Sequence, residues 1–247
     1  MDWGLYAYGV VRPGVDIPVG TTGVAGAAVD VAEIDSLGVV VSPIDGGDLH
    51  ARRDDLLAHS DVLQRITEQT DVLPMSFGCV FADRKELADT FIAPNRDALS
   101  RLLDRIGGHV EFQIKGSYVQ QAVLVEIAAT DAKLKKLQAR ARSSSSVEAQ
   151  IEVGRRVATL LDDKRYGDAR SIADTLRPLA ADLSIADAQG EYGVINASFL
   201  VPRGSAVLFI EKAERLQEDL GDRVSLRCLG PLPPYSFVSA EELVGVS

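Results

Sequence analysis

The sequence predicts an α+β protein made of two domains. Its 247 residues fit one large domain or two of about 100–150 residues each. Segments with alternating large apolar side chains are interspersed with segments in which apolar residues recur every three or four positions, so both strands and helices are expected. A glycine pair, Gly107-Gly108, follows a run of predicted helices. We therefore expect an N-terminal α+β domain over residues 1–108 and a C-terminal domain over residues 109–247.

The first domain is predicted to contain three extended segments. LYAYGVV (5–11) alternates large side chains and stops at a Pro-Gly turn, and LGVVVSPI (37–44) is a second strand. VLPMSFGCVF (72–81) is also expected to be extended, because Pro74 is excluded from a helix interior and Gly78 permits a bulge or a close backbone approach.

Three helices are predicted in the same domain. The first covers residues 52–66, where helical spacing places four side chains on one face: Leu56, His59, Leu63 and Ile66. Two more are expected at 84–92 and 95–106, the second stopped by Gly107-Gly108. A histidine on an apolar face is more often a core residue with satisfied nitrogens than a catalytic base, and we interpret His59 in that way.

The second domain is predicted to begin with a strand and to carry a helical insertion. VEFQIKGSYV (110–119) alternates as a strand, and QAVLVEIAA (121–129) is expected to continue extended. Asp131 is predicted to cap a helix that runs to about Ala141. Ser145 and Glu148 match a capping box ahead of a helix that carries Val147, Ile151, Gly154, Val157 and Leu161. Another helix is indicated by Ile172, Leu176, Leu179 and Leu183, kinked or divided at Pro178. We expect these helices to form a hairpin inserted between strands.

The end of the second domain has a strand–helix–strand pattern. YGVINASFLV (192–201) and VSLRCLG (224–230) are predicted strands, and a helix is expected over residues 205–220. Such a βαβ unit places its two strands parallel in one sheet. Together with the strand at 110–119, this predicts a ferredoxin-like α+β domain.

The charge distribution limits the classes of partner. The formal net charge is −10, which argues against nucleic acid, because binding to phosphates needs a basic surface. No apolar run approaches the roughly 18 residues that span a bilayer, and the opening residues lack a basic leader, so a cytosolic protein without a lipid-membrane partner is expected. Residues 131–170 are an exception in charge, with ten Lys/Arg against six Asp/Glu. This basic segment, which includes Arg155 and Arg156, is either a solvated helical face or a docking patch for an acidic partner.

A search for catalytic or ligand-binding motifs identifies no catalytic, cofactor-binding or metal-binding residues. GTTGVAG (20–26) matches neither a dinucleotide fingerprint nor a phosphate loop. The three histidines, His50, His59 and His109, show no pairing at metal-ligand spacing. Cys79 and Cys228 are far apart and outside any C-x-x-C, so both are expected to be reduced and structural.

The chain ends in a stretch rich in proline and aromatic residues, CLGPLPPYSFV (228–238). Pro231, Pro233 and Pro234 restrict the backbone around them to extended or polyproline geometry. A stiff segment loses little entropy on docking, so Tyr235 and Phe237 are candidates for insertion into a groove. The groove belongs either to the protein itself or to a partner. We select Pro231, Pro233, Pro234, Tyr235 and Phe237, together with Arg155 and Arg156, as candidate partner-binding residues.

Four segments in the same order resemble one protein family. The ending GPLPPYSFV is similar to the G-P-x-P-P-Y-x-F-V signature of the gas vesicle accessory proteins GvpF and GvpL. LYAYGVV, HSDVLQRI followed by VLPMSFGCVF, and VEFQIKGSY fit the same pattern, so the resemblance covers nearly the whole chain. Ser76 departs from the pattern, in which we expect an arginine before Phe-Gly.

The resemblance implies a non-catalytic assembly factor for gas vesicles, with an N-terminal α+β domain and a C-terminal ferredoxin-like domain rich in helix. The implied partners are the very hydrophobic major shell protein and other accessory proteins, with no cofactor, in the cytoplasm and at the vesicle. The alternative from another class is a cytosolic enzyme or small-ligand sensor on a ferredoxin-like domain, in which His59 or His109 would line a pocket.

Overall fold

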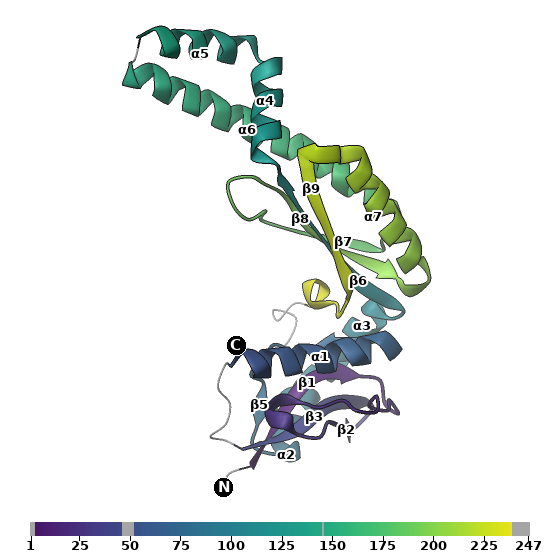
Figure 1. Ribbon diagram of the computed structural model, residues 1–247. Helices are drawn as coiled ribbons and strands as arrows, with labels where there is room; N and C mark the ends of the chain where they lie inside the picture. Colours follow the sequence, from purple (N-terminus) through teal and green to yellow (C-terminus); the bar gives the residue numbers. More distant parts are fainter. Residues whose placement is uncertain (1–2, 46–51, 145, 239–247) are drawn as a thin grey trace. The chain divides into compact units, whose positions relative to one another are not determined.

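Figure 1 shows the computed structural model of the protein, which describes residues 3–45, 52–144 and 146–238. The chain forms two β-sheets, each with its own set of helices. The first sheet is built from β1 (Trp3–Val11), β2 (Asp30–Ile34), β3 (Leu37–Asp45), β4 (Val72–Pro74) and β5 (Val80–Phe81). The second sheet is built from β6 (His109–Tyr118), β7 (Asp182–Ala186), β8 (Gly193–Pro202) and β9 (Val224–Leu232). The mixed α+β class expected from the sequence is confirmed.

The first sheet has the strand order β2-β3-β1-β4, and β5 also pairs with β1. β1 pairs antiparallel with β3, β4 and β5, and its register with β3 shifts between Ala7 and Gly9. This bulge changes which face the side chains reach. Tyr6 and Tyr8 belong to one apolar core, whereas Val10 belongs to the core on the opposite face. The edge strand β2 was not predicted, because exposed Asp30 and Glu33 interrupt its apolar pattern.

Helices cover both faces of the first sheet. α1 (Arg53–Gln69) buries Val62, Leu63 and Ile66 in the same core as Tyr6 and Tyr8. The other face is covered by a continuous helical stretch made of α2 (Arg84–Glu86), a π-helical segment (Leu87–Ile92) and α3 (Ala93–Ile106). The fold therefore buries β1 and β3 on both sides, which explains their nearly unbroken apolar sequences.

The two helices expected at 84–92 and 95–106 are joined rather than separate. The connecting turn is π-helical, and the Ala93 amide donates to the carbonyl of Ala88, five residues earlier. Pro94 lies in the first turn of α3, where its missing N–H is tolerated. The chain stays helical from Arg84 to Ile106 through this π-helical segment. α3 ends at Ile106, and Gly108 adopts a left-handed φ of 71°.

The second sheet has the strand order β7-β8-β6-β9. Between β6 and β7 the chain forms α4 (Gln120–Thr130), α5 (Ala132–Ser144) and α6 (Val147–Leu176), and α7 (Ala206–Leu220) connects β8 to β9. α7 packs the ring of Phe209 at 5.3 Å from that of Phe199 in β8. The insertion is a helical hairpin, as expected, and α5 and α6 extend beyond the sheet of this unit (Figure 1).

Three local predictions in the insertion are wrong. Residues 121–129 are helical rather than extended, and Val123 and Ile127, one helical turn apart, are both buried. The prediction failed because an apolar run without a clear period does not distinguish a helix from a strand. The helix expected to include Leu183 ends at Leu176, and residues 182–186 form β7 instead. A single 3₁₀ turn (Arg177–Leu179) carries Pro178, and the chain becomes extended at Ala180. The cap of α6 is Ser146, whose hydroxyl accepts from the Ala149 amide; Ser145 lies outside the described residues.

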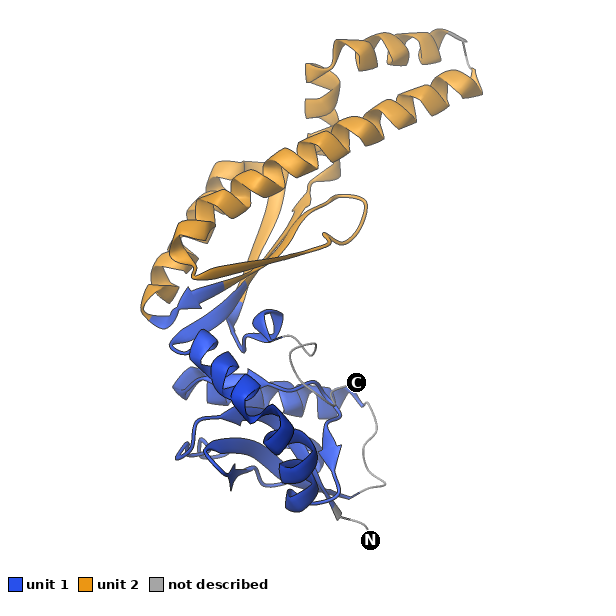
Figure 2. Cartoon of the chain, turned by 180° about the vertical axis from the view of Figure 1, so that it is seen from behind, with its two compact units in different colours: residues 1–112, 200–203, 230–247 blue, residues 113–199, 204–229 orange. Residues whose placement is uncertain are grey.

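Contacts divide the chain into two compact units, coloured separately in Figure 2. The first unit comprises Met1–Phe112, Leu200–Arg203 and Gly230–Ser247, and the second comprises Gln113–Phe199 and Gly204–Leu229. The domain boundary expected after residue 108 stays a prediction. The Pro-rich tail, which we expected in the second domain, groups with the first unit. None of the helices in the described ranges combines the length and apolarity needed to cross a bilayer.

Candidate partner-binding surfaces

The Pro-rich tail docks on the first unit through side chains from three elements. Gln64 of α1 donates to the carbonyl of Pro231 at 3.0 Å. Arg105 of α3 donates to the carbonyl of Phe237. Glu111 of β6 accepts from both the amide and the hydroxyl of Ser236, at 2.9 and 2.7 Å. These contacts hold the tail along its length, and the turn at Tyr235–Phe237 is a single 3₁₀ turn rather than an extended segment.

Gly230 is required where the tail begins. Its φ is 148°, a conformation that side chains rarely adopt, and an added Cβ would lie 2.5 Å from the ring of Phe112 and 2.9 Å from the carbonyl oxygen of Glu111. Only glycine therefore lets the tail pass so close to β6. The close approach to β6 thus explains why the G-P-x-P-P motif begins with glycine in this fold.

His59 connects the tail to the core of the first unit. Its Nε2 lies 3.2 Å from the carbonyl of Met75 and 3.1 Å from the hydroxyl of Tyr235, and its Nδ1 lies 2.9 Å from the hydroxyl of Tyr6. Because a carbonyl can only accept, Nε2 carries the proton and Nδ1 accepts from Tyr6. The ring is 4% exposed and stacks on Tyr8 at 5.6 Å. Burial lowers the pKa of His59, so the neutral form is favoured.

The structure gives the tail residues selected from the sequence different environments. Phe237 is 6% exposed, Pro233 and Pro234 are buried, and Pro231 is half-buried. Tyr235 keeps 43% of its surface exposed although its hydroxyl contacts His59. Burial raises the pKa of Tyr235 to about 12, so it stays a neutral phenol. Docking within the chain therefore uses Phe237 and the two buried prolines, and Tyr235 is the selected aromatic residue that remains accessible.

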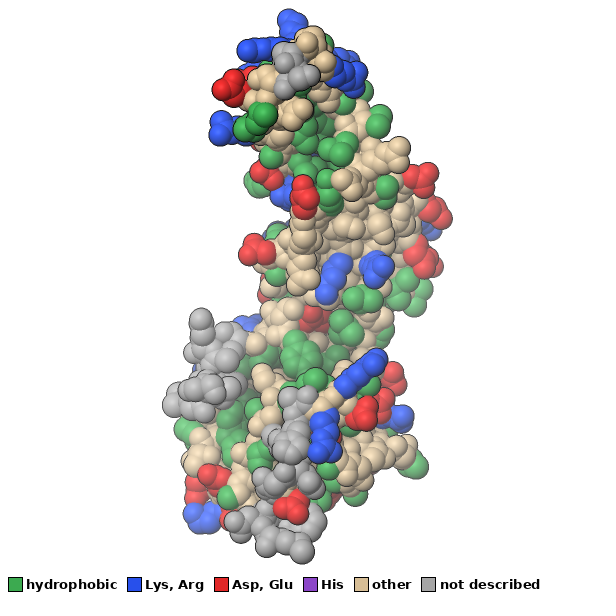
Figure 3. Space-filling view, turned by 60° about the vertical axis from the view of Figure 1, so that its left-hand side comes forward, with side chains coloured by type: hydrophobic (Ala, Val, Ile, Leu, Met, Phe, Trp, Pro, Cys, Tyr) green, Lys and Arg blue, Asp and Glu red, His purple; other side chains and the backbone are tan. Residues whose placement is uncertain are grey.

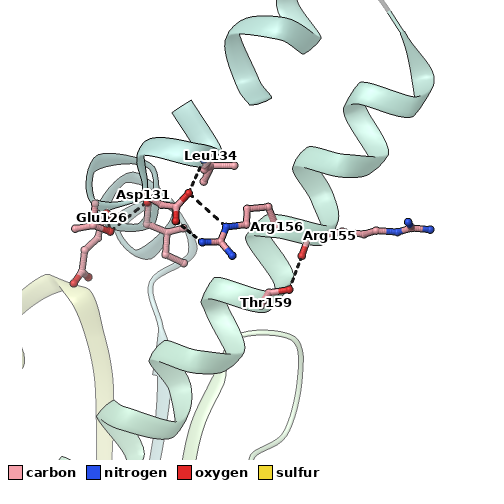
Figure 4. A network of polar contacts seen from close by, with 8 residues as sticks. Glu126, Asp131, Leu134, Arg155, Arg156 and Thr159 are labelled. Atoms are coloured by element: carbon pink, nitrogen blue, oxygen red, sulfur yellow. Dashed lines mark hydrogen bonds and ion pairs between the residues drawn. The ribbon is translucent and has the colours of Figure 1, made fainter. Parts of the chain in front are cut away.

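Arg156 and Arg155, the basic residues selected from the sequence, have different roles. Asp131, between α4 and α5, caps α5 by accepting from the Leu134 amide and pairs with Arg156 of α6 at 2.5 Å. The guanidinium of Arg156 and the Leu134 amide lower the pKa of Asp131. Figure 4 shows Arg156 turned toward Asp131 and Arg155 pointing away from it. Arg156 therefore holds the hairpin together, whereas exposed Arg155 is available for a partner.

A second charged network ties the helical insertion to the strands of its unit. Lys164 lies 2.8 Å from Glu126 and 3.3 Å from Asp168, and Arg223 lies 3.6 Å from Glu126. Asp168 also accepts from the hydroxyl of Tyr118 at 2.8 Å, which helps to raise the pKa of that phenol, after the larger effect of burial. The two cations, Lys164 and Arg223, balance the two anions, Glu126 and Asp168. The charge of Lys164, which belongs to the basic segment, therefore has a structural role.

Other candidates from the sequence are accounted for by the fold. The glycine-rich residues 20–26 end in a 3₁₀ turn (Val24–Gly26), where the Val24 amide donates to the hydroxyl of Tyr8. Cys79 and Cys228 are free and half-buried, and burial raises the pKa of both thiols, that of Cys228 to about 11. Nδ1 of His109 lies 2.6 Å from the carbonyl of Gly107, and His50 lies outside the described residues. Within those residues, no three His, Cys, Asp or Glu side chains are grouped as metal ligands.

Sequence reasoning did not identify the residues that receive the tail. Gln64, Arg105 and Glu111 lie between 125 and 167 positions from their tail partners. Each is an ordinary polar residue on its own element, so no local pattern distinguishes it. Glu111 is the one residue that its local sequence could have indicated. It lies between apolar residues in a strand, and a buried carboxylate needs a hydrogen-bonding partner.

The docked tail and the helical hairpin belong to a mixed α+β protein with two sheets, and this fold matches solved structures. The crystal structure of the gas vesicle protein GvpF from Anabaena superposes with a TM-score of 0.85 at 24% identity and covers 95% of this chain and 97% of that one. GvpF from Microcystis aeruginosa gives a TM-score of 0.80 at 24% identity over 95% and 98% of the two chains.

The sequence comparisons establish the family. The family described as "Gas vesicle synthesis protein GvpL/GvpF" matches residues 4–239. Gas vesicle protein F from a Streptomyces species is 31% identical over 94% of this chain and 98% of its own length. Gas vesicle protein F from Haloferax mediterranei is 29% identical over 96% and 94%. The chain belongs to the GvpL/GvpF family of gas vesicle proteins.

Proposed function

We propose that this chain is a non-catalytic accessory protein that binds the hydrophobic major shell protein and other accessory proteins during nucleation and assembly of gas vesicles. It acts in the cytoplasm and at the growing vesicle. The observation that carries the proposal is the family match over residues 4–239, which includes both sheets, the hairpin and the docked tail. We also infer that the second unit is ferredoxin-like, because its elements follow the order β-α-β-β-α-β with the α4–α6 insertion as the first helical part.

The surface of the chain is compatible with such a role. A shell subunit with exposed apolar surface aggregates unless a soluble protein covers that surface before assembly. The helices of the second unit expose several large apolar side chains beside charged ones: Val125, Val147, Ile151 and Tyr166. A net charge of −10 favours solubility of the chain and its complexes. Tyr235 and Arg155 stay our proposed partner contacts, since both are exposed.

The direct test is capture of the shell protein. Tagged chain, purified from cells that make vesicles, is expected to retain the shell protein, and deletion of the gene is expected to reduce the number of vesicles. Simultaneous replacement of Tyr235 and Arg155 by Ala removes both exposed side chains and should weaken capture, and circular dichroism should show that the fold is retained. Absence of capture by the unmodified chain, with normal vesicles in the deletion strain, would remove the proposal.

A further inference from the structure

The helix α6 carries an apolar seam on the side of the helix opposite Ala149. Val147, Ile151, Gly154, Ala158 and Leu161 are spaced alternately by four and three residues, so they form one stripe along the helix. Ala149, two positions from Val147, is 4% exposed in the hairpin, whereas Val147 and Ile151 are 69% and 49% exposed. The stripe from Val147 to Leu161, which we call the α6 seam, is therefore a second apolar face of this helix, exposed at Val147 and Ile151 and buried at Leu161.

The inner half of the α6 seam opens into a groove of about 560 Å³ within the second unit. Its lining includes Leu124 of α4, Leu134 of α5 and Tyr192, together with three residues of the seam: Gly154, Ala158 and Leu161. An added Cβ on Gly154 would meet no atom within 4 Å, so the space above this glycine is open. Small residues at the middle of a seam allow the backbone of another helix to approach closely.

The charge around the α6 seam identifies the kind of partner. Residues 132–161 contain seven Lys/Arg and two Glu, in a protein whose net charge is −10. Asp162 and Glu191 also line the groove, and Asp162 pairs with Arg165, so the excess of positive charge lies on the hairpin beside the groove rather than in its lining. Arg155 lies one turn from both Ile151 and Ala158, and Lys135 and Arg142 lie one turn on either side of Gln138, which lines the groove. Figure 3 shows hydrophobic side chains at the hairpin end, at the top of the view, with both Lys/Arg and acidic side chains beside them and the basic ones prevailing at the tip.

We propose that the α6 seam docks an amphipathic helix with acidic residues beside its apolar stripe, supplied by another protein. The distance along the helix from Val147 to Leu161 is about 21 Å at about 1.5 Å per residue, so about four turns of helix fit. A hairpin from a second copy of this chain carries the same positive charge and is repelled. The proposal rests on the proposed function, because it names the surface and the chemistry by which this accessory protein recognises one partner.

Two synthetic helical peptides of about 20 residues, long enough to cover the seam, test the proposal on the full-length chain. Both carry the same Leu and Ile stripe, and the positions beside the stripe are Glu in one peptide and Lys in the other. The Glu peptide is expected to bind in fluorescence anisotropy with an affinity that falls about tenfold between low and high salt, because exposed charges are screened. Binding of both peptides with equal affinity, or no binding of the Glu peptide, would overturn the proposal.

A matched pair of glycine variants locates the binding. Gly154→Leu fills the open space in the seam and is expected to weaken binding of the Glu peptide at least tenfold. Gly167→Leu changes the same helix at another position with equally open surroundings and should leave binding unchanged. Both variants should stay folded, because leucine is a better helix former than glycine. Equal effects of the two variants on binding would exclude the seam as the site.

Analytical sedimentation of the full-length chain tests whether a second copy occupies the α6 seam. A monomer is expected for both the unmodified chain and Gly154→Leu. A dimer that Gly154→Leu dissociates would show that a second copy fills the seam, against the proposal. Failure of the unmodified chain to capture shell protein contradicts the proposed function, whereas failure of the Glu peptide to bind contradicts this inference alone.

Discussion

His59 shows how a single residue couples the tail to the first core. Its ring is surrounded by Tyr6, Tyr8 and Phe77, and its two nitrogens contact the hydroxyl of Tyr6, the carbonyl of Met75 and the hydroxyl of Tyr235. The hydroxyl of Tyr6 already accepts from the Gly78 amide, so a protonated His59 would leave the Tyr6 proton without its acceptor. The histidine therefore acts as a neutral structural residue in this environment.

The lowered pKa of His59 predicts a loss of stability in mild acid. The unfolded chain binds a proton at His59 near its usual pKa of about 6.5, whereas the folded chain resists protonation, so unfolding takes up a proton as the pH falls below that value. Thermal unfolding midpoints should decrease between about pH 7.5 and about pH 5.5. His59→Gln, which keeps one N–H donor, should be less stable at neutral pH but should lose this part of the pH dependence. Parallel curves for the two proteins would contradict the assignment.

The two aromatic residues of the tail should differ in their contribution to stability. Phe237→Ala removes a ring that is 6% exposed and should decrease the free energy of unfolding by about 3–5 kcal/mol. Tyr235→Phe removes only a hydroxyl contact and should cost about 0.5–1.5 kcal/mol. Urea unfolding followed by circular dichroism measures both. Equal, small effects would mean that the tail does not contribute to the core in solution.

At the scale of elements, the hairpin depends on the junction between α4 and α5. Asp131 ends one helix, caps the next and pairs with Arg156 of α6, so one carboxylate serves three elements. Asp131→Asn keeps a capping side chain but loses the charge. Hydrogen exchange should become faster in α5, while α7, which lies outside the hairpin, should be unchanged. Equal protection of α5 in both proteins would contradict this role.

The long helix α6 contains two exposed glycines that reduce its stability. Gly167 has no atom within 4 Å of an added Cβ, so Gly167→Ala should increase the free energy of unfolding by about 0.5–1 kcal/mol through helix propensity. Gly154→Ala should add a similar amount independently, because the two sites are more than about three turns apart. Urea titrations of the two single variants and the double variant measure these gains. A loss of stability at Gly154 would show that the seam is already occupied within the protein.

Prediction from the sequence succeeded where one local signal decided the structure. The structure contains the predicted strands at 5–11, 37–44, 110–119 and 192–201 and the predicted helix at 205–220. Prediction failed where two signals competed. The run at 121–129 is apolar at nearly every position, so its buried pair, Val123 and Ile127, could not be recognised before the fold was known.

The candidate surfaces were less predictable than the elements. The proline motif indicated a docked tail, but the sequence left open what it docks on, because Gln64, Arg105 and Glu111 come together only in the folded chain. The basic segment was visible as a count of charges. The sequence did not show that Arg156 is paired and Arg155 is exposed, because this depends on where the folded chain places Asp131 and α5.

At the scale of the whole molecule, charge is distributed unevenly along the chain. The net charge is −10, yet residues 132–161 carry seven Lys/Arg against two Glu. An acidic partner is therefore repelled by most of the chain and attracted by the hairpin, which favours encounter at one surface. This effect is screened by salt, so association with an acidic partner should become slower as ionic strength increases.

The first unit contains residues from both ends of the described chain, so its stability depends on the Pro-rich tail. Residues 230–238 contact α1, α3 and β6 of the first unit, although they follow the whole second unit in sequence. A chain truncated after Leu232, the last residue of β9, loses Phe237 from the core and the Ser236 partner of buried Glu111, which leaves a carboxylate without its hydrogen bonds. Hydrogen exchange in this variant should accelerate in α1 and α3 and stay unchanged in α7. The matched control is a chain truncated after Val238, because it retains every described contact of the tail. Faster hydrogen exchange in α7 of the shorter chain would show that the two units do not unfold independently.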